Sequence, residues 1–291
     1  MFSGSIPALV TPFTAGRVDE EAFRVFVEWQ IEEGSSAIVP CGTTGEVATL
    51  GNPEQHRVFK LAVEQARGRV PVIAGCGSNN TATVLEHMRA AEEAGADAAL
   101  IVIPYYNKPS QAGLILHFQA IAAASRLPII VYNVPGRTVA DISVATLTEV
   151  AKLPTVVGIK DATGQLGRVT AQRLACGTDF CQLSGNDETA LAFNAMGGVG
   201  CISVTANVAP RLCAEFQQAC AEARWSDALA LQDKLYPLHD AMFADASPGP
   251  AKYALSRLRP GFSTEVRLPM SEPSAAARAV VDAALAHAGL A

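Results

Sequence analysis

The sequence is poor in charged residues and contains no run of lysines or arginines. Asp, Glu, Lys and Arg together make up 17% of its 291 residues, and the formal net charge at pH 7 is −6. Soluble domains contain roughly 25% charged residues, so this chain lies well below the usual fraction. The acidic balance and the lack of a basic cluster exclude nucleic acid and an anionic membrane surface as main partners. An apolar fraction of 49% beside so little charge predicts a large core and a subunit interface.

Long apolar segments and paired cysteines are also missing. The longest apolar run, residues 98–104, is far shorter than the ~20 residues that a transmembrane helix needs. Residues 1–7 carry neither the basic region nor the apolar core of a secretory signal. The seven cysteines are an odd number, and no two of them form a C-x-x-C pair. These features predict a cytoplasmic protein with reduced thiols and no membrane segment.

Patterns for metal or phosphate binding are absent as well. Neither H-x-H nor H-E-x-x-H spacing occurs among the five histidines, which are His56, His87, His117, His239 and His287. The glycine-rich stretch 197–200 precedes a predicted strand, so it indicates a helix-to-strand turn and no phosphate site. Asp187 and Glu188 are predicted to begin the preceding helix, where acids favour the dipole. We expect no metal site.

Short apolar runs alternate with segments of helical periodicity through the first two thirds of the chain. The predicted strands are residues 5–10, 37–40, 70–74, 98–103, 128–132, 156–160, 181–184 and 200–203. Their apolar character is continuous, as parallel strands buried on both faces require, and their spacing matches βα units. The pattern predicts an α/β protein with a (β/α)8 TIM barrel. A doubly wound open sheet is the alternative, but no G-x-G-x-x-G follows an early strand.

Strand signals end at about residue 210, and only helical patterns follow. Helices are predicted around residues 211–224, 227–242, 250–258 and 274–288. No linker rich in Ser and Gly separates this part from the barrel. We therefore divide the chain into a catalytic barrel, 1–209, and a C-terminal helical extension, 210–291, packed on the barrel.

Lys160 is the residue best placed for covalent chemistry. Among six lysines only Lys160 directly follows an apolar strand, and functional groups of such barrels stand at the C-terminal ends of the strands. A buried amine there is free to attack a carbonyl group. The alternative is a structural lysine paired with an acid such as Asp161 or Glu46.

Tyrosines and threonines at neighbouring strand ends support the same chemistry. Tyr105, Tyr106 and Tyr132 follow the fourth and fifth strands, where hydroxyl groups can relay protons. Rim or interface aromatics are the alternative for at least one of them. Thr43 and Thr44 can offer hydroxyl and backbone N–H groups to a small carboxylate, although many tight turns share the Gly-Thr-Thr-Gly pattern.

Four ordered motifs carry a family resemblance. They are Gly42-Thr43-Thr44-Gly45-Glu46, Tyr132-Asn133-Val134-Pro135-Gly136-Arg137-Thr138, Gly158-Ile159-Lys160-Asp161 and Ile202-Ser203-Val204-Thr205-Ala206-Asn207. With residues 104–111 and 267–270 they resemble, over essentially the whole chain, the dihydrodipicolinate synthase family. This family belongs to the pyruvate-dependent aldolases that use a lysine Schiff base. The resemblance implies a lyase that condenses pyruvate with L-aspartate 4-semialdehyde to 4-hydroxy-tetrahydrodipicolinate, in diaminopimelate and lysine biosynthesis.

The resemblance also implies roles for matching residues. Lys160 would form the imine with pyruvate, while Tyr132, Thr44 and Tyr106 would relay protons, Tyr106 acting from the neighbouring subunit. Thr43 and Thr44 would hold the pyruvate carboxylate. Arg137 would bind the carboxylate of aspartate semialdehyde, a role that suits a guanidinium group.

Further implications concern the pocket walls, the assembly and the competing functions. Gly185 and Ile202 would line the pyruvate pocket. The family uses no metal or organic cofactor, and it is commonly a homotetramer built from dimers. A sister aldolase acting on a sugar-derived 2-keto acid is the first alternative, and Arg137 argues against it because such relatives usually lack this arginine. A catalytically inactive barrel used as a binding protein is the second alternative.

One departure from the family pattern concerns regulation. Members inhibited by lysine use a tyrosine and an asparagine, which Tyr105 and Asn79 match, together with a serine and a glutamate. This chain has Val47 and Thr83 at the latter two positions. Threonine cannot supply the carboxylate that pairs with an ammonium group, so we expect weak or absent inhibition by lysine.

Overall fold

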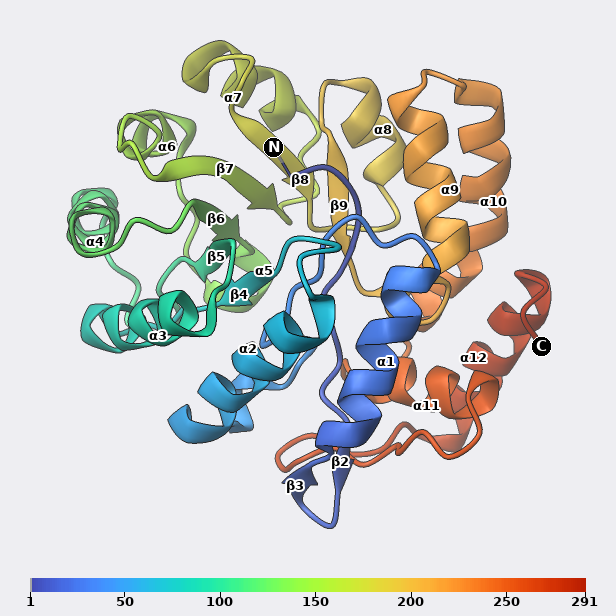
Figure 1. Cartoon of the computed structure of the whole chain (residues 1–291). Helices are drawn as coiled ribbons and strands as arrows, with labels where there is room; N and C mark the ends of the chain where they lie inside the picture. The colour runs from blue at the N-terminus through green and yellow to red at the C-terminus, as the bar shows by residue number, and fades with distance from the viewer. Residues whose placement is uncertain (1) are drawn as a thin grey trace.

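Seven parallel strands form the centre of the computed structural model, which describes residues 2–291. Helices surround these strands in Figure 1. The strands in the order of the sheet are β1 (Gly4–Pro7), β9 (Gly200–Ser203), β8 (Cys181–Ser184), β7 (Val156–Asp161), β6 (Ile129–Asn133), β5 (Ala98–Val102) and β4 (Ile73–Gly75).

Residues 37–40 close the sheet into a barrel between β1 and β4. The N–H of Val39 donates to the carbonyl of Pro7 at 3.0 Å, and the N–H of Ile73 donates to the carbonyl of Ile38 at 2.9 Å. Isolated parallel bridges join Ala8 to Val39 and Ile38 to Val72. Segment 37–40 is therefore the eighth position of the barrel, and the predicted (β/α)8 fold is confirmed.

Helices follow the strands as the sequence predicts. They are α1 (Glu20–Glu32), α2 (Asn52–Ala66), α3 (Thr81–Ala94), α4 (Gln111–Ala124), α5 (Pro135–Thr138), α6 (Val144–Val150), α7 (Gly167–Cys176) and α8 (Ala190–Ala195). Asp19 caps α1 by accepting from the N–H of Ala22, and Gly95 ends α3 in the left-handed conformation. The N-cap of α2 is Gly51, and Asn52 is the first residue of the helix.

Two local expectations differ from the structure. A small hairpin, β2 (Phe13–Thr14) and β3 (Arg17–Val18), was not predicted, and its turn residues Ala15 and Gly16 both have positive φ. Asp187 does not begin a helix, because α8 starts at Ala190. Its carboxylate instead accepts from the N–H groups of Val204 and Thr205, which follow β9.

The apolar core has an inner and an outer layer. Alternation along β6 sends Ile130 and Tyr132 into the barrel, while Ile129 and Val131 face the helices. The outer layer is the larger, because every strand packs its second face against a helix.

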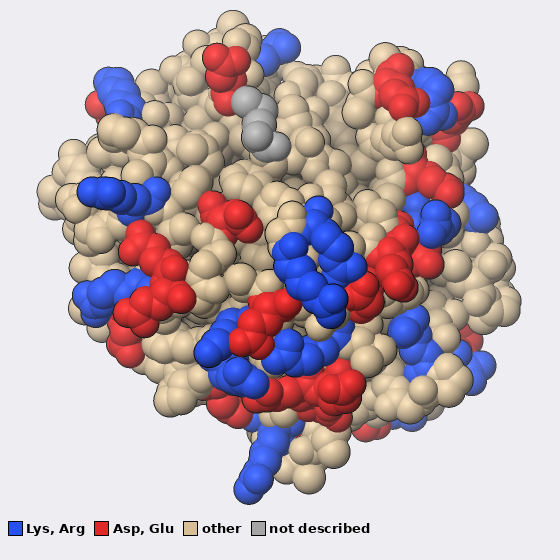
Figure 2. Space-filling view, viewed as in Figure 1, with Lys and Arg blue, Asp and Glu red and all other residues tan. Residues whose placement is uncertain are grey.

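Charged side chains gather where α1 and α2 meet, and Figure 2 shows both signs alternating over these helices. Two ion pairs join α1 to α2, Glu20 with Arg57 and Arg24 with Glu64, and a third joins Glu28 of α1 to Arg69, which follows α2. The hydrogen bonds from Arg69 lower the pKa of Glu28 to about 2. These exposed pairs orient the helices and contribute little stability individually.

The last part of the chain is helical, as predicted. It contains α9 (Pro210–Ala221), α10 (Trp225–Ala241), α11 (Gly249–Leu258) and α12 (Ala275–His287). In Figure 1, α9 and α10 stand beside α8, while α11 and α12 lie beyond α1. The division of the chain at residue 209 stays a prediction. Within residues 2–291, no helix is both long and apolar enough to cross a membrane.

A buried ion pair joins the C-terminal helices to the barrel. Lys252 of α11 is fully buried, and its Nζ donates to Oε1 of Glu46 at 2.6 Å and to the carbonyl of Glu265 at 2.7 Å. The other carboxylate oxygen of Glu46 accepts from the N–H of Arg267. Burial lowers the pKa of Lys252, and the Glu46 carboxylate opposes that effect. The acid of the Gly-Thr-Thr-Gly-Glu turn is thus held by residues more than 200 positions away.

Removing the cation of this pair should destabilise the whole chain. Lys252→Met leaves the Glu46 carboxylate buried without its partner, so we expect the free energy of unfolding in urea to fall by about 3–5 kcal/mol. Lys152→Met is the control, because Lys152 pairs with Glu149 at the surface and its side chain is 64% exposed. That variant should lose less than about 1 kcal/mol. Equal losses in both variants would contradict the assigned role of Lys252.

Candidate active site

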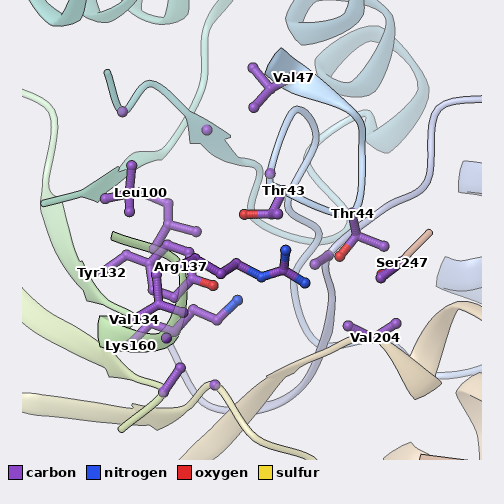
Figure 3. A pocket seen from close by; sticks show the side chains of 18 of the residues that line it. Thr43, Thr44, Val47, Leu100, Tyr132, Val134, Arg137, Lys160, Val204 and Ser247 are labelled. Atoms are coloured by element: carbon purple, nitrogen blue, oxygen red, sulfur yellow. The ribbon is translucent and has the colours of Figure 1, made fainter. Parts of the chain in front are cut away.

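A cavity of about 420 Å³ lies at the C-terminal ends of the strands. Its walls come from the segments that follow the barrel strands, and Figure 3 shows their side chains converging on one space. Six predicted site residues line it: Thr43, Thr44, Tyr132, Arg137, Lys160 and Gly185.

Lys160 and Tyr132 are neighbours because β6 and β7 pair in parallel register. The register places Tyr132 opposite Lys160, and Nζ of Lys160 lies 4.3 Å from the centre of the Tyr132 ring. Lys160 is only 6% exposed, so the amine stands in a largely dry environment beside an aromatic face.

The structural alternative for Lys160 required an acidic partner, and the described residues supply none. Asp161 faces the outer side of the barrel, where its carboxylate accepts from Gln172 and Thr163. Glu46 is engaged by Lys252. Burying a lysine without a counter-ion costs free energy. The presence of Lys160 at this place therefore favours a chemical task for its amine over a structural one.

Two threonines form the facing wall. Thr44 is buried and Thr43 is exposed, and both belong to the turn between residues 37–40 and the 3₁₀ helix η1 (Val47–Thr49). Figure 3 shows their hydroxyl groups on the side that faces Arg137. Among the described residues, neither hydroxyl group forms a hydrogen bond, so both can serve a bound molecule.

Arg137 reaches into the cavity from α5. Its guanidinium extends past Lys160 toward Thr44 in Figure 3. No ion pair of Arg137 occurs in the part of the chain that the structure describes, and no Asp or Glu is among the described residues of the wall. The described wall therefore carries one arginine, one lysine and no acid. Such a wall selects anionic molecules.

Gly185 is required beside the lysine for steric reasons. A methyl group added at Gly185 would come within 2.6 Å of Cβ of Ala162 and 3.1 Å of Cε of Lys160. The absence of a side chain at this position leaves room for the Lys160 side chain to extend into the cavity.

Two predicted site residues do not line the cavity. Ile202 of β9 is buried in the inner layer of the barrel core. Tyr106 is 87% exposed, has a φ of 70° and is not among the residues that line the cavity of its own chain. The structure therefore brings together six of the predicted residues and leaves these two apart.

Sequence reasoning missed several residues of the outer wall. Phe243 and Ser247 come from the connection between α10 and α11 and stand at the cavity edge. No local motif marks them, because their place depends on how the C-terminal helices return to the barrel. Val204 also lines the wall, and the carboxylate of Asp187 fixes its backbone.

A second cavity of about 390 Å³ adjoins the first and shares Thr43, Val47 and Arg137 with it. Tyr105, Gln55 and His87 line its far end, and burial lowers the pKa of His87. Among its described lining residues there is no Asp or Glu. Within residues 2–291, no group of three or more His, Cys, Asp or Glu side chains could hold a metal ion.

The comparison with protein families identifies this arrangement. The model of the dihydrodipicolinate synthetase family matches residues 1–288. The chain belongs to this family. Two full-length relatives named 4-hydroxy-tetrahydrodipicolinate synthase are 68% identical, from Rhizorhabdus wittichii, and 64% identical, from Zymomonas mobilis; in both cases the match covers 100% of each chain.

Solved structures give the same result. The dihydrodipicolinate synthase of Acinetobacter baumannii, crystallised in complex with pyruvate, superposes with a TM-score of 0.97 at 42% identity, covering 100% of both chains. The predicted family, the TIM-barrel fold and the predicted lyase class are thereby confirmed. The two relatives at 68% and 64% identity carry the same enzyme name.

Proposed function

We propose that Lys160 forms a Schiff base with pyruvate and that the resulting enamine condenses with L-aspartate 4-semialdehyde. The observation that carries this proposal is the uncompensated Lys160 amine, 4.3 Å from the Tyr132 ring, in a cavity whose described wall has no acid. Both substrates are carbonyl compounds that carry a carboxylate, which suits a wall bearing Lys160, Arg137 and two threonines.

The chemistry follows from the positions of these groups. The neutral amine attacks the keto carbon of pyruvate, and the carbinolamine loses water to give the imine. Tyr132 and Thr44 donate a proton to the leaving hydroxyl group. Thr43 and Thr44 bind the carboxylate of pyruvate. A methyl proton then passes to the Tyr132 and Thr44 relay, which leaves the enamine. The enamine carbon attacks the aldehyde carbon, and the aldehyde oxygen takes up a proton from the same relay to become a hydroxyl group.

Arg137 binds the carboxylate of the aldehyde at the cavity mouth in this scheme, in a bidentate contact. The amino group of the second substrate then closes the ring by attack on the imine carbon, which releases Lys160. Gly185 and Ile202 shape the pyruvate subsite, Gly185 in the wall and Ile202 in the core layer.

The proposal extends to the assembly. Tyr106 acts in the cavity of a neighbouring subunit, which agrees with a tyrosine that is 87% exposed in the single chain. We propose a cytoplasmic homotetramer built from dimers, without metal or organic cofactor, composed of a catalytic barrel, residues 1–209, and a helical extension, residues 210–291.

Replacing the nucleophile tests the proposed function directly. The wild-type chain should turn over pyruvate and aspartate semialdehyde in an assay coupled to the reductase that consumes the product. Lys160→Ala should abolish this turnover, because no other amine lines the described cavity. Borohydride with pyruvate alone should add a reduced adduct to Lys160, as read by mass spectrometry.

The alternatives give different results in the same experiment. An adduct on Lys160 without turnover of aspartate semialdehyde would indicate a sister aldolase with another aldehyde. Absence of both adduct and turnover would indicate a binding protein, and full activity of Lys160→Ala would refute the Schiff-base mechanism.

Gly185→Ala should impair catalysis through the lysine. The added methyl group displaces Cε of Lys160, and a shift of about 1 Å at a reacting group can cost on the order of 100-fold in rate. We expect kcat to fall at least about 10-fold. Gly167→Ala is the control, because a methyl group there has no heavy atom within 4 Å. Equal kcat for wild type and Gly185→Ala would show that Lys160 tolerates the displacement.

We expect L-lysine to inhibit this enzyme weakly or not at all. The second cavity, which Val47 and Tyr105 line, has no acid in its described wall, and Thr83 stands where inhibited relatives have a glutamate. The ammonium groups of lysine would therefore lose water without gaining a counter-ion, and initial rates should change little at millimolar L-lysine. Thr83→Glu supplies the carboxylate that inhibited relatives have, and this variant should become sensitive. Strong inhibition of the wild type would contradict the prediction.

A further inference from the structure

A cluster of polar side chains lies outside the barrel, directly behind the catalytic pair. Tyr132 and Lys160 face the cavity, so the next residues along each strand, Asn133 and Asp161, face the helix layer. Both are buried, with exposures of 0% and 4%. Nothing in the reaction scheme uses this outer face, and its polar groups need partners.

Arg168 of α7 is the centre of this cluster. Its side chain is only 12% exposed. Nη2 donates to the carbonyl of Ile142 at 2.6 Å, and Nη1 donates to Oδ2 of Asp141 at 3.2 Å. Nε lies 3.4 Å from Oδ2 of Asp161, which is an ion-pair contact without hydrogen-bond geometry.

These contacts fix one end of the segment that carries Arg137. Asp141 and Ile142 end the loop between β6 and α6, and Asn133 at its start donates from Nδ2 to Oδ1 of Asp141 at 2.8 Å. Arg168 thus ties the far end of the loop to β7 while Asn133 ties it to β6. Arg137 belongs to α5, in the middle of this connection, so both ends of the segment that carries its guanidinium are held.

The catalytic lysine has separate support. The carboxylate of Asp161 also accepts from the N–H and hydroxyl groups of Thr163 and from Nε2 of Gln172, at 2.6–2.8 Å. Loss of Arg168 therefore leaves Asp161 with three hydrogen bonds. At the loop end, Gln111 holds the carbonyl of Asp141 and the N–H of Ser143, and Asn133 holds Oδ1 of Asp141 and the N–H of Ile142. Among the described residues, only Arg168 bonds to Oδ2 of Asp141 and to the carbonyl of Ile142, so both acceptors lose their partner when Arg168 is replaced.

We propose that Arg168 is a positioning residue that acts through Arg137 on the binding of the aldehyde substrate, and not on imine formation at Lys160. The inference rests on the proposed function, because it assigns Arg137 to the carboxylate of aspartate semialdehyde. A flat guanidinium with several donors suits this task, since one side chain must reach a carbonyl and two carboxylates at once.

The test separates the two substrates. Arg168→Met should raise the KM for aspartate semialdehyde by roughly 10-fold, because the loop that carries Arg137 loses its anchor. The rate at which borohydride traps pyruvate on Lys160 should stay within about twofold of the wild-type rate. Asp141→Asn weakens the same anchor at its exposed end and should shift the same KM in the same direction by a smaller factor. Arg173→Met is the matched control on α7, because Arg173 is exposed and lies against Gly197, and it should leave both values unchanged.

A double-variant cycle decides whether Arg168 acts through Arg137. In the Arg137→Met background, adding Arg168→Met should change the KM for the aldehyde by less than about twofold. The effects of two substitutions are not additive when one residue acts through the other. The same 10-fold rise in both backgrounds, or a trapping rate that falls as much as turnover, would overturn the inference. Failure of the proposed function would already appear in the wild type as absent turnover and would overturn both.

Discussion

The pairing of β6 with β7 in parallel register is the constraint on which the rest of the site depends. It sets Tyr132 opposite Lys160 and Asn133 opposite Asp161. Side chains alternate along a strand, so a slip of β7 by one residue would send Lys160 into the helix layer and leave Tyr132 in the cavity without it. The apolar residues of β7 resist such a slip, because Ile159 would leave the outer core. Packing of ordinary apolar side chains thus holds the reactive amine in place.

Two buried lysines show how environment assigns different tasks to one residue type. Lys252 is fully buried with a carboxylate at 2.6 Å, and its pair with Glu46 joins the C-terminal helices to the turn that carries Thr43 and Thr44. Lys160 is almost as buried but has an aromatic ring in place of an acid among the described residues. A counter-ion would hold the amine as an ammonium group, which is not nucleophilic. Glu46, which the sequence offered as an acidic partner of Lys160, pairs with Lys252 instead.

Strand ends were predictable from sequence, whereas contacts between distant segments were not. Lys160, Tyr132 and the Thr43-Thr44 turn could be found because each follows an apolar strand, and the barrel rule brings such ends together. The partner of Glu46 lies 206 residues away on a helix with no distinguishing pattern, so sequence reasoning offered Lys160 instead. Asp187 looked like the first acid of a helix, but it turns back to bind the N–H groups after β9, a choice decided by tertiary geometry. Phe243 and Ser247 were missed for the same reason.

The inner and outer faces of the barrel wall have different tasks, and this difference explains why the outer face keeps a polar cluster. A largely buried arginine beside the buried carboxylate of Asp161 costs desolvation free energy that apolar packing would avoid, so stability alone does not favour Arg168 at this place. Its benefit is directional: a guanidinium with partners on β7 and on the loop after β6 restricts how that loop can move, which an apolar side chain could not do. The contacts of Arg168 order the segment after β6 from the outer face. The side chains of the inner face can therefore remain unpaired, as substrate binding requires. Chemistry inside the barrel and positioning outside it are two consequences of one strand register.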